Sequence, residues 1–571
     1  MKIKYIIRIV VISSLLAIPG NIISQYSRIL IIVPDEFYEE ILPLKNFKDC
    51  SARKCHVVKL TNIYNNSQYS TGSRDNPEKI KKCIADYKKS YSVNYVLLVG
   101  DCDKFPVRYC RAINTQWGTK YYPADLYYAD IYKSDGVTFD NWNSGSPNGW
   151  LGEIDFKGFG EKNMSKLNID NLNLYPDIAV GRILASTQAE IKTYVEKVIS
   201  YEIKAPGNWF EKALWITDED WGTAAKKDRL DTYMTGFSII KPYTDPLWGV
   251  HAPNHISRDE RALRINNHIN NGVGFVNYFG HGCRSSWSWV YDQYDTYDDM
   301  GSLTNKNMLP IVFAVSCYTG RFHFDQCINS CITEDKYMAV NDIEWTNSNK
   351  VATRPEPRAV QPAIYDRESM AEEFTVKRST GGVAYIGCSS INEFGGEDLD
   401  KYFFEAFKIK PKPITLGQMW DHARTQFISN VDLTSFFAYL HLYKVNMFGD
   451  PSIVVGGAYA KDISENIDPN TIPNVKKILG YSRSRIDIDI TVPTGQLMHI
   501  DSSASILFEN GKKIIAMDSN IDKGLTVSGC YSYMPVCMIS LSKNTQSKYL
   551  IHGIKVSEKL KLRNGGEIKL H

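Results

Sequence analysis

A histidine and a cysteine stand where two apolar segments of the chain end. The first segment, 272–279, leads into His281, which has a glycine on each side, and the second, 311–316, leads into Cys317. An imidazole can take the proton of a thiol, and the resulting thiolate is a strong nucleophile. This pair of residue types therefore predicts covalent acyl-transfer chemistry, in which the thiolate attacks a carbonyl carbon.

The spacing of the two residues fits a shared site. They lie 36 positions apart (317 − 281), which leaves room for one crossover between neighbouring parallel strands, and the carboxyl ends of such strands meet at one edge of the sheet. A glycine such as Gly282 lets the backbone turn sharply there, and amides near Gly282 and Cys317 are candidate oxyanion donors. A structural role for either residue stays open, because a strand-end cysteine or histidine is more often simply buried.

The segments around these residues alternate between strand and helix patterns. This alternation predicts an α/β fold with a parallel sheet covered on both faces. One long sheet and two side-by-side subdomains both remain open. The expected strands are 28–34, 94–100, 177–183, 213–217, 274–279, 311–316 and 382–387, and the expected helices are 76–89, 187–204, 261–271, 399–407 and 416–429.

The pattern changes near residue 465. Helical periodicity disappears, and 486–492 alternates between apolar and polar residues as a half-buried strand does. Asn510-Gly511 stands between two apolar runs, which is a hairpin signal. Residues 465–571 are therefore predicted to form a β-sandwich.

The N-terminus has the layout of a secretory signal peptide. Three basic residues within 1–8 precede an apolar run, 9–18, and Pro19-Gly20 follow. We expect 1–25 to be removed during export, which leaves a secreted or cell-surface protein without a membrane span. The run is short for a bilayer, although an uncleaved anchor is the alternative interpretation.

Charge bears on the kind of binding partner, and cysteine content bears on where the protein acts. The 66 basic residues balance 64 acidic ones, and no basic stripe points to nucleic acid, so no nucleic-acid partner is expected. Twelve cysteines suit an exported protein. Close pairs such as Cys102 and Cys110 could form short-loop disulfides, but sequence does not fix their connectivity, and their spacing is unlike that of zinc knuckles.

Four motifs in order resemble the gingipain family of cysteine peptidases, whose fold is related to that of caspases. The resemblance extends over roughly residues 27 to 456. The motifs are Tyr175-Pro-Asp-Ile-Ala-Val-Gly-Arg182, Tyr278-Phe-Gly-His-Gly282, Phe313-Ala-Val-Ser-Cys317 and Met447-Phe-Gly-Asp-Pro-Ser452.

This resemblance implies two caspase-like three-layer subdomains with mainly parallel sheets. Residues 26–206 would form the non-catalytic one and 207–460 the catalytic one, followed by an immunoglobulin-like β-sandwich at 465–571. In the catalytic subdomain, His281 would be the general base and Cys317 the nucleophile.

The resemblance also suggests an acidic third member and a specificity pocket. Asp220 aligns best with the family's acidic residue, with Glu219 as the alternate. Asp228 matches the acidic pocket base of arginine-specific members, and Phe394 lies one position from an expected pocket aromatic. A preference for Arg or Lys before the scissile bond is the corresponding expectation.

Structural calcium is a further expectation from the family, whereas no cofactor is expected for catalysis. The oxygen-rich segment 140–153 offers Asp140, Asn143 and Glu153 as candidate ligands, since Ca²⁺ takes six to eight oxygen ligands. An ordinary polar loop is the alternative for this segment.

The sequence thus predicts a secreted cysteine endopeptidase that acts on proteins or peptides. Two alternatives use the same features. A transpeptidase-like processing enzyme would resolve the acyl-enzyme with an amine instead of water. A non-enzymatic surface binding protein would keep the peptidase scaffold without its catalytic activity.

Overall fold

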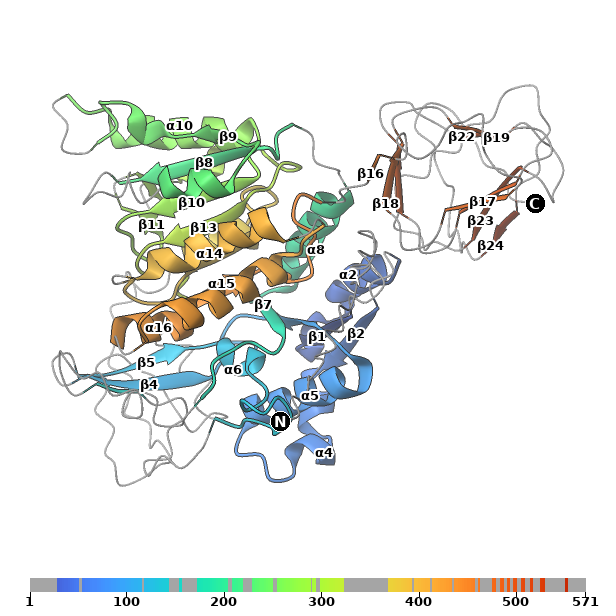
Figure 1. The fold of residues 1–571 in the computed structure, drawn as a ribbon, viewed down its shortest axis with the longest axis horizontal. Helices are drawn as coiled ribbons and strands as arrows, with labels where there is room; N and C mark the ends of the chain where they lie inside the picture. Colours follow the sequence, from blue (N-terminus) through green and yellow to red (C-terminus); the bar gives the residue numbers. More distant parts are fainter. Residues whose placement is uncertain are drawn as a thin grey trace, which may run out of the picture.

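A ten-stranded sheet flanked by helices forms the centre of this computed structural model (Figure 1). Its strand order is β2-β1-β3-β7-β15-β14-β13-β10-β8-β9. The structure describes residues 28–50, 54–114, 118–142, 154–156, 172–203, 208–218, 228–249, 254–288, 290–293, 298–322, 368–392, 395–410, 413–433 and 436–457, together with short strands between 461 and 552.

The elements of the first α/β group precede residue 204. They are β1 (Ile29–Val33), η1 (Asp35–Phe37), α2 (Tyr38–Cys50), β2 (Cys55–Lys59), α3 (Leu60–Tyr64), α4 (Ser67–Ser70), α5 (Asn76–Tyr91), β3 (Tyr95–Val99), β4 (Tyr109–Asn114), β5 (Gly118–Pro123), α6 (Leu126–Ala129), β6 (Ile154–Phe156), β7 (Ala179–Ile183) and α8 (Gln188–Ile203).

The second group follows residue 208. It contains β8 (Lys212–Thr217), η2 (Arg229–Tyr233), β9 (Ser238–Ile240), η3 (Pro242–Thr244), α10 (Arg258–Asn270), β10 (Phe275–Phe279), β11 (Ser286–Trp287), β12 (Tyr291–Asp292), η4 (Asp299–Ser302), β13 (Ile311–Val315), α13 (Met370–Thr375), β14 (Ala384–Cys388), α14 (Gly396–Ile409), α15 (Leu416–Asn430), α16 (Phe436–Lys444) and β15 (Val445–Phe448).

The central strands are buried on both faces, as their uninterrupted apolar sequences predict. Every residue of β1, β3, β13 and β14 is buried. In β13, Ile311, Phe313 and Val315 belong to the core that includes α14 and α15, whereas Val312 and Ala314 belong to the core that includes α10 and α13. Since successive side chains of a strand point to opposite faces, these helix pairs cover opposite faces and form three layers.

The two groups of strands join into one continuous sheet, whereas the predicted division into subdomains 26–206 and 207–460 stays a prediction. β2, β1, β3 and β7 pair in parallel, and so do β9, β8, β10, β13 and β14. β15 lies between the groups, antiparallel to β14, and its Phe448 pairs with Arg182 of β7. The fold is therefore a mostly parallel, mixed α/β sheet, which agrees with the caspase-like fold that the resemblance implies.

Side-chain caps fix where several helices begin. Ser257 accepts a hydrogen bond from the amide of Glu260 at the start of α10. Ser369 and Thr415 form capping boxes with Glu372 and Gln418 at the starts of α13 and α15. Such caps satisfy amides that have no partner within the helix.

The predicted immunoglobulin-like sandwich is not confirmed. The described strands of this region are β16 (Lys461–Asp462), β17 (Val475–Ile478), β18 (Arg483–Ile486), β19 (Ile490–Val492), β20 (Leu497–Ile500), β21 (Ser505–Phe508), β22 (Ile514–Ala516), β23 (Gly524–Ser528) and β24 (Leu550–His552). Their pairs are parallel, whereas an immunoglobulin-like sandwich is antiparallel. β21 and β22 flank Asn510-Gly511 but belong to different sheets, so the predicted hairpin is wrong.

Over the described ranges, none of the helices is both long enough and apolar enough to cross a bilayer. The predicted signal peptide, 1–25, lies outside the described residues.

Candidate active site

His281 and Cys317 follow neighbouring strands in matching register. β10 and β13 pair in parallel with Phe279 opposite Val315, and each candidate residue lies two positions beyond its strand. Neighbouring strands are about 4.8 Å apart. Parallel register therefore brings the two residues to the same edge of the sheet, where His281 is exposed and Cys317 is partly exposed.

The backbone of His281 is held from both sides by buried side chains. A carboxylate oxygen of Asp218, which directly follows β8, accepts the His281 amide N–H. The Tyr278 hydroxyl donates to the His281 carbonyl oxygen at 2.5 Å. Burial raises the pKa of Tyr278 well above its usual value, so this hydroxyl stays protonated and keeps its donor role.

The glycines on either side of His281 are required by close packing. A Cβ on Gly280 would lie 2.4 Å from Cγ of Asp218, and one on Gly282 would lie 2.1 Å from Oγ of Ser316. Real Cβ atoms do not approach other atoms this closely, because interiors are packed to van der Waals contact. The Gly-His-Gly sequence is thus what allows β8, β10 and β13 to converge at the edge.

The turn after β13 is tied to the loop after β14. The amide of Asn392 donates to Sγ of Cys317 at 3.3 Å. The amide of Tyr318 donates to the Ser390 carbonyl at 2.8 Å, with Tyr318 at a φ of 58°. A positive φ at a non-glycine residue costs free energy and often marks functional sites, and here it accompanies the presentation of the thiol.

The loop that carries His281 interacts with Asp101 of the first α/β group and with α13 of the second. Asp101 lies two positions beyond the end of β3, and its charge interacts with that of Arg284, three residues beyond His281. Arg284 also lies 3.6 Å from a carboxylate oxygen of Glu372, and its carbonyl accepts the amide of Met370. The loop of the histidine is therefore anchored to α13.

The acidic residue that the structure brings to His281 is Asp218, which the sequence interpretation missed. Asp220 and Glu219, the predicted third member and its alternate, lie outside the described residues, so their roles stay predictions. All three residues belong to one acidic run, and only the register of β8 with β10, Thr217 opposite Phe279, singles out the first.

The structure gives little information on the two predicted pocket residues, Asp228 and Phe394. Phe394 lies outside the described residues. Asp228 is about half exposed, and Oδ1 accepts from Nζ of Lys241 at 2.5 Å and from the Tyr243 hydroxyl at 3.0 Å. These partners lower the pKa of Asp228. Its charge is thus already matched by a lysine, and its role at the base of a pocket stays a prediction.

The predicted calcium ligands are only partly described. Asn143 and Glu153 lie outside the described residues. Asp140 is buried and accepts the amide of Trp142 at 2.8 Å. Within the described ranges no group of three or more acidic, His or Cys side chains is arranged to hold a metal.

A lysine supplies positive charge where Asp140 lies. Lys81 is fully buried, with Nζ 4.4 Å from the ring centroid of Tyr127, and the charges of Asp130 and Asp140 act on it. Burial lowers the pKa of Lys81 to about 8. The described residues around Asp140 therefore do not fit a calcium site, and calcium binding stays a prediction.

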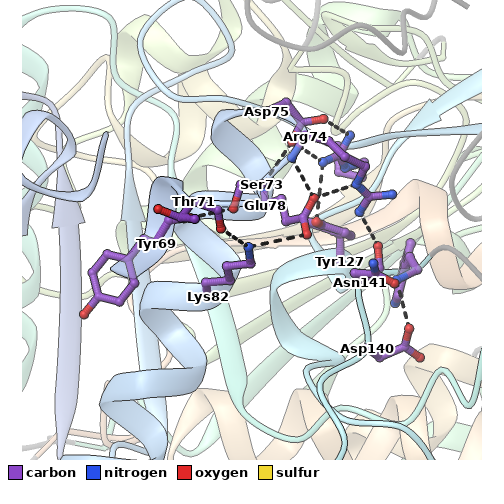
Figure 2. Close-up of polar contacts among 12 residues, drawn as sticks. Tyr69, Thr71, Ser73, Arg74, Asp75, Glu78, Lys82, Tyr127, Asp140 and Asn141 are labelled. Atoms are coloured by element: carbon purple, nitrogen blue, oxygen red, sulfur yellow. Dashed lines mark hydrogen bonds and ion pairs between the residues drawn. The ribbon is translucent and has the colours of Figure 1, made fainter. Parts of the chain in front are cut away.

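A polar network surrounds this region (Figure 2). Arg74 donates to Glu78 at 2.6 Å and to the carbonyl of Asn141. Asp75 caps α5 through the amide of Glu78 and forms a fully buried ion pair with Arg108 at 2.7 Å. The ion pairs of Arg74 with Glu78 and of Arg108 with Asp75 offset part of the cost of burying these charges.

Comparison with known proteins identifies the family. The model of peptidase family C25 matches residues 23–343 and 355–456, which is most of the chain. The chain belongs to peptidase family C25. The predicted resemblance to the gingipains is confirmed by similar proteins of that name.

Several C25 relatives come from Porphyromonas gingivalis. A gingipain R2 is 26% identical over 246 residues, which cover 40% of this chain and 31% of the relative, and another gingipain R2 is 22% identical over 383 residues, 62% of this chain and 49% of the relative. A Lys-gingipain is 29% identical over 171 residues, 28% of this chain and 9% of the relative. This C25 chain thus spans about a third to a half of the length of the gingipain R2 relatives.

The fold agrees with that of a solved gingipain. The crystal structure of the Arg-specific cysteine proteinase gingipain R matches with a TM-score of 0.50 and 18% identity, over 76% of this chain and 78% of that one. At this identity the match supports the α/β fold alone.

Proposed function

We propose that this C25 chain is a cysteine peptidase that hydrolyses peptide bonds with Cys317 as nucleophile and His281 as general base. The observation that carries the proposal is the register of β10 with β13, which brings both residues to one edge of the sheet. The bonds from Asp218 and Tyr278 to the backbone of His281 support it, because they orient the base.

The proposed reaction follows from these groups. His281 takes the thiol proton, and the thiolate attacks the carbonyl carbon of the scissile peptide bond. The amide at Gly282 is the candidate donor to the oxyanion of the tetrahedral intermediate. Its collapse breaks the C–N bond while the imidazolium gives its proton to the leaving amine, and water then hydrolyses the thioester.

A preference for Arg or Lys before the scissile bond is the finer part of the proposal. The names of the relatives, which include an Arg-specific proteinase and a Lys-gingipain, support it. Asp228 is the candidate acidic group, and its bond to Lys241 would have to open for a basic substrate side chain to bind there.

Export is proposed on the composition of 1–25 and on the resemblance to the gingipains. Protein or peptide substrates follow from membership of a peptidase family.

Covalent labelling tests the nucleophile. A peptidyl chloromethyl ketone ending in arginine should label wild type and not Cys317→Ala. Cys283→Ser is the matched control, since Cys283 is also partly exposed and lies near the same edge, and it should be labelled as wild type is. Equal labelling of Cys317→Ala would refute the proposed nucleophile.

Two further measurements separate the finer alternatives. A matched probe ending in norleucine should react more slowly than the arginine probe, and Asp228→Asn should reduce that difference. Product analysis with an added amine acceptor distinguishes hydrolysis from transpeptidation, because only the latter joins the acyl group to the acceptor.

A further inference from the structure

A second histidine is connected to the candidate nucleophile through the loop that follows β14. That loop, 389–392, forms two hydrogen bonds with the turn at Cys317, one as donor and one as acceptor. The amide of Asn392 donates to Sγ of Cys317 at 3.3 Å, and the carbonyl of Ser390 accepts from the amide of Tyr318 at 2.8 Å. The position of the Asn392 amide therefore determines whether the sulfur keeps this hydrogen bond.

The side chain of Asn392 is fixed by His441. Oδ1 of Asn392 lies 3.0 Å from Nε2 of His441, a residue of α16 that is completely buried. The first residue of α14, Gly396, leaves room for the amide group, since a Cβ there would lie 2.3 Å from Oδ1 of Asn392. A packed amide paired with a buried ring has little freedom to move.

His441 is itself fixed relative to the same loop. α16 runs directly into β15, and the carbonyl of Lys444, three residues after His441, accepts the amide of Ser389 at 2.7 Å. The ring also contacts Phe427 of α15, with 6.4 Å between centroids. The loop is thus held at its start by the end of α16 and at Asn392 by the histidine of that helix.

We propose that His441 is a positioning residue for Cys317, acting through Asn392 on the loop whose amide N–H binds the nucleophilic sulfur. This inference rests on the proposed function, because it matters for catalysis only if Cys317 is the nucleophile. A hydrogen bond to a charged acceptor is roughly twice as strong as one to a neutral acceptor. The Asn392 amide therefore stabilises the thiolate more than the thiol, and His441 maintains that preference.

The experiment compares two replacements of His441 in the full chain. His441→Leu removes the partner of Asn392, whereas His441→Gln keeps an amide that can bond to it. His422→Leu is the matched control, because His422 is also largely buried and paired, at 3.3 Å, with Glu405. Asn392→Ala keeps the backbone N–H but removes the link, so it tests the same connection if His441→Leu fails to fold.

The readout is the rate of iodoacetamide alkylation at Cys317 as a function of pH, measured by peptide mass spectrometry, together with kcat and KM. In His441→Leu the midpoint of the alkylation profile should move up by about one pH unit, and kcat should fall about tenfold at neutral pH with little change in KM. Asn392→Ala should behave alike, and His441→Gln should stay within about threefold of wild type. His422→Leu should keep the wild-type profile.

The outcomes separate the two proposals. Folded His441→Leu and Asn392→Ala with the wild-type alkylation profile would overturn the positioning role while leaving the proposed function intact. Full peptidase activity in Cys317→Ala would instead overturn the proposed function. A loss in His422→Leu equal to that in His441→Leu would assign the effect to general destabilisation and would also contradict the positioning role.

Discussion

The ends of β3 and β7 in the first α/β group contrast with the ends of β8, β10 and β13 in the second. In the first group, Arg182 is completely buried, and its guanidinium binds both carboxylate oxygens of Asp125 and the carbonyl of Gly100. In the second, His281 is exposed and Cys317 partly exposed, and it is their surroundings that are buried.

This contrast separates a structural region of the sheet from the region that holds the candidate active site. Charges that pair with one another inside the protein are closed to substrate, and removing one partner leaves the other buried without compensation. At the strand ends of the second group, the side chains that hold the backbone of His281, Asp218 and Tyr278, are buried, whereas the candidate catalytic side chains are accessible. Substitutions in the two regions should therefore separate loss of activity from loss of stability.

The largest expected effect is on activity and arises from His281→Ala. Peptide hydrolysis should fall by about 10⁴-fold or more, because the proposed general base would be lost. The unfolding midpoint should change little, because the side chain is exposed. Steady-state kinetics measures the rate of hydrolysis, and thermal unfolding monitored by circular dichroism measures the midpoint. A large fall in the unfolding midpoint of His281→Ala would contradict the contrast between the two groups of strands.

The corresponding effect in the first group is on stability and arises from Arg182→Leu. The free energy of unfolding should fall by about 3–5 kcal/mol, because Asp125 would be left buried without its partner. Urea unfolding measures this. The double variant Asp125→Asn/Arg182→Leu should lose less, and a double variant at least as unstable as the single one would contradict the interpretation.

Gly282→Ala should lower kcat by about a hundredfold, since the added Cβ would collide with Ser316 and displace the turn beside the base. Adding Ser316→Ala removes the Oγ atom that causes the collision and should restore part of the rate. A single variant with wild-type kcat would show that the turn tolerates a side chain.

Asp218→Asn should lower kcat by about tenfold with little change in KM, because a charged acceptor of the His281 amide becomes a neutral one of the same size. Kinetics of the folded variant checks this. An unchanged kcat would remove Asp218 from the residues that position the base.

A further expected effect is the pH dependence of stability due to Asp101. Burial raises the pKa of this carboxyl to about 7, against about 3.9 in an unfolded chain. The folded state thus holds the extra proton, and the stabilisation, complete below about pH 4, is lost as pH rises through 7.

Asp101→Asn should accordingly gain stability relative to wild type between pH 5 and pH 8. Asparagine keeps an oxygen that can accept the amide of Cys102, as Oδ1 of Asp101 does at 2.7 Å. Urea unfolding at several pH values gives the comparison. Parallel stability curves for the two proteins would contradict the raised pKa.

Sequence patterns were sufficient for the elements that run through the core. The apolar runs that contain β1, β3, β8, β10, β13 and β14 have no other stable place in a folded chain, and residues at their ends follow from simple topology. That is why His281 and Cys317 could be predicted to lie at one edge of the sheet, together with the glycines that the convergence of strands requires.

The supporting residues could not be selected in the same way. Asp218 differs from Glu219 and Asp220 only by strand register. Asn392 and His441 are 49 positions apart in the sequence and meet because β14 pairs with β15. Contacts of this kind depend on tertiary packing, which no local pattern encodes. The C-terminal strands show the reverse case, where a hairpin signal did not predict the pairing.

The most direct test of the pairing of His281 with Cys317 is the location of the acyl-enzyme. Wild type and His281→Ala are mixed with a peptide ester, quenched in acid within the first turnover, and mapped by mass spectrometry. We predict an acyl group on Cys317 in wild type and almost none in His281→Ala. An acyl group on another residue, or equal acylation of Cys317 in both proteins, would contradict the proposed site.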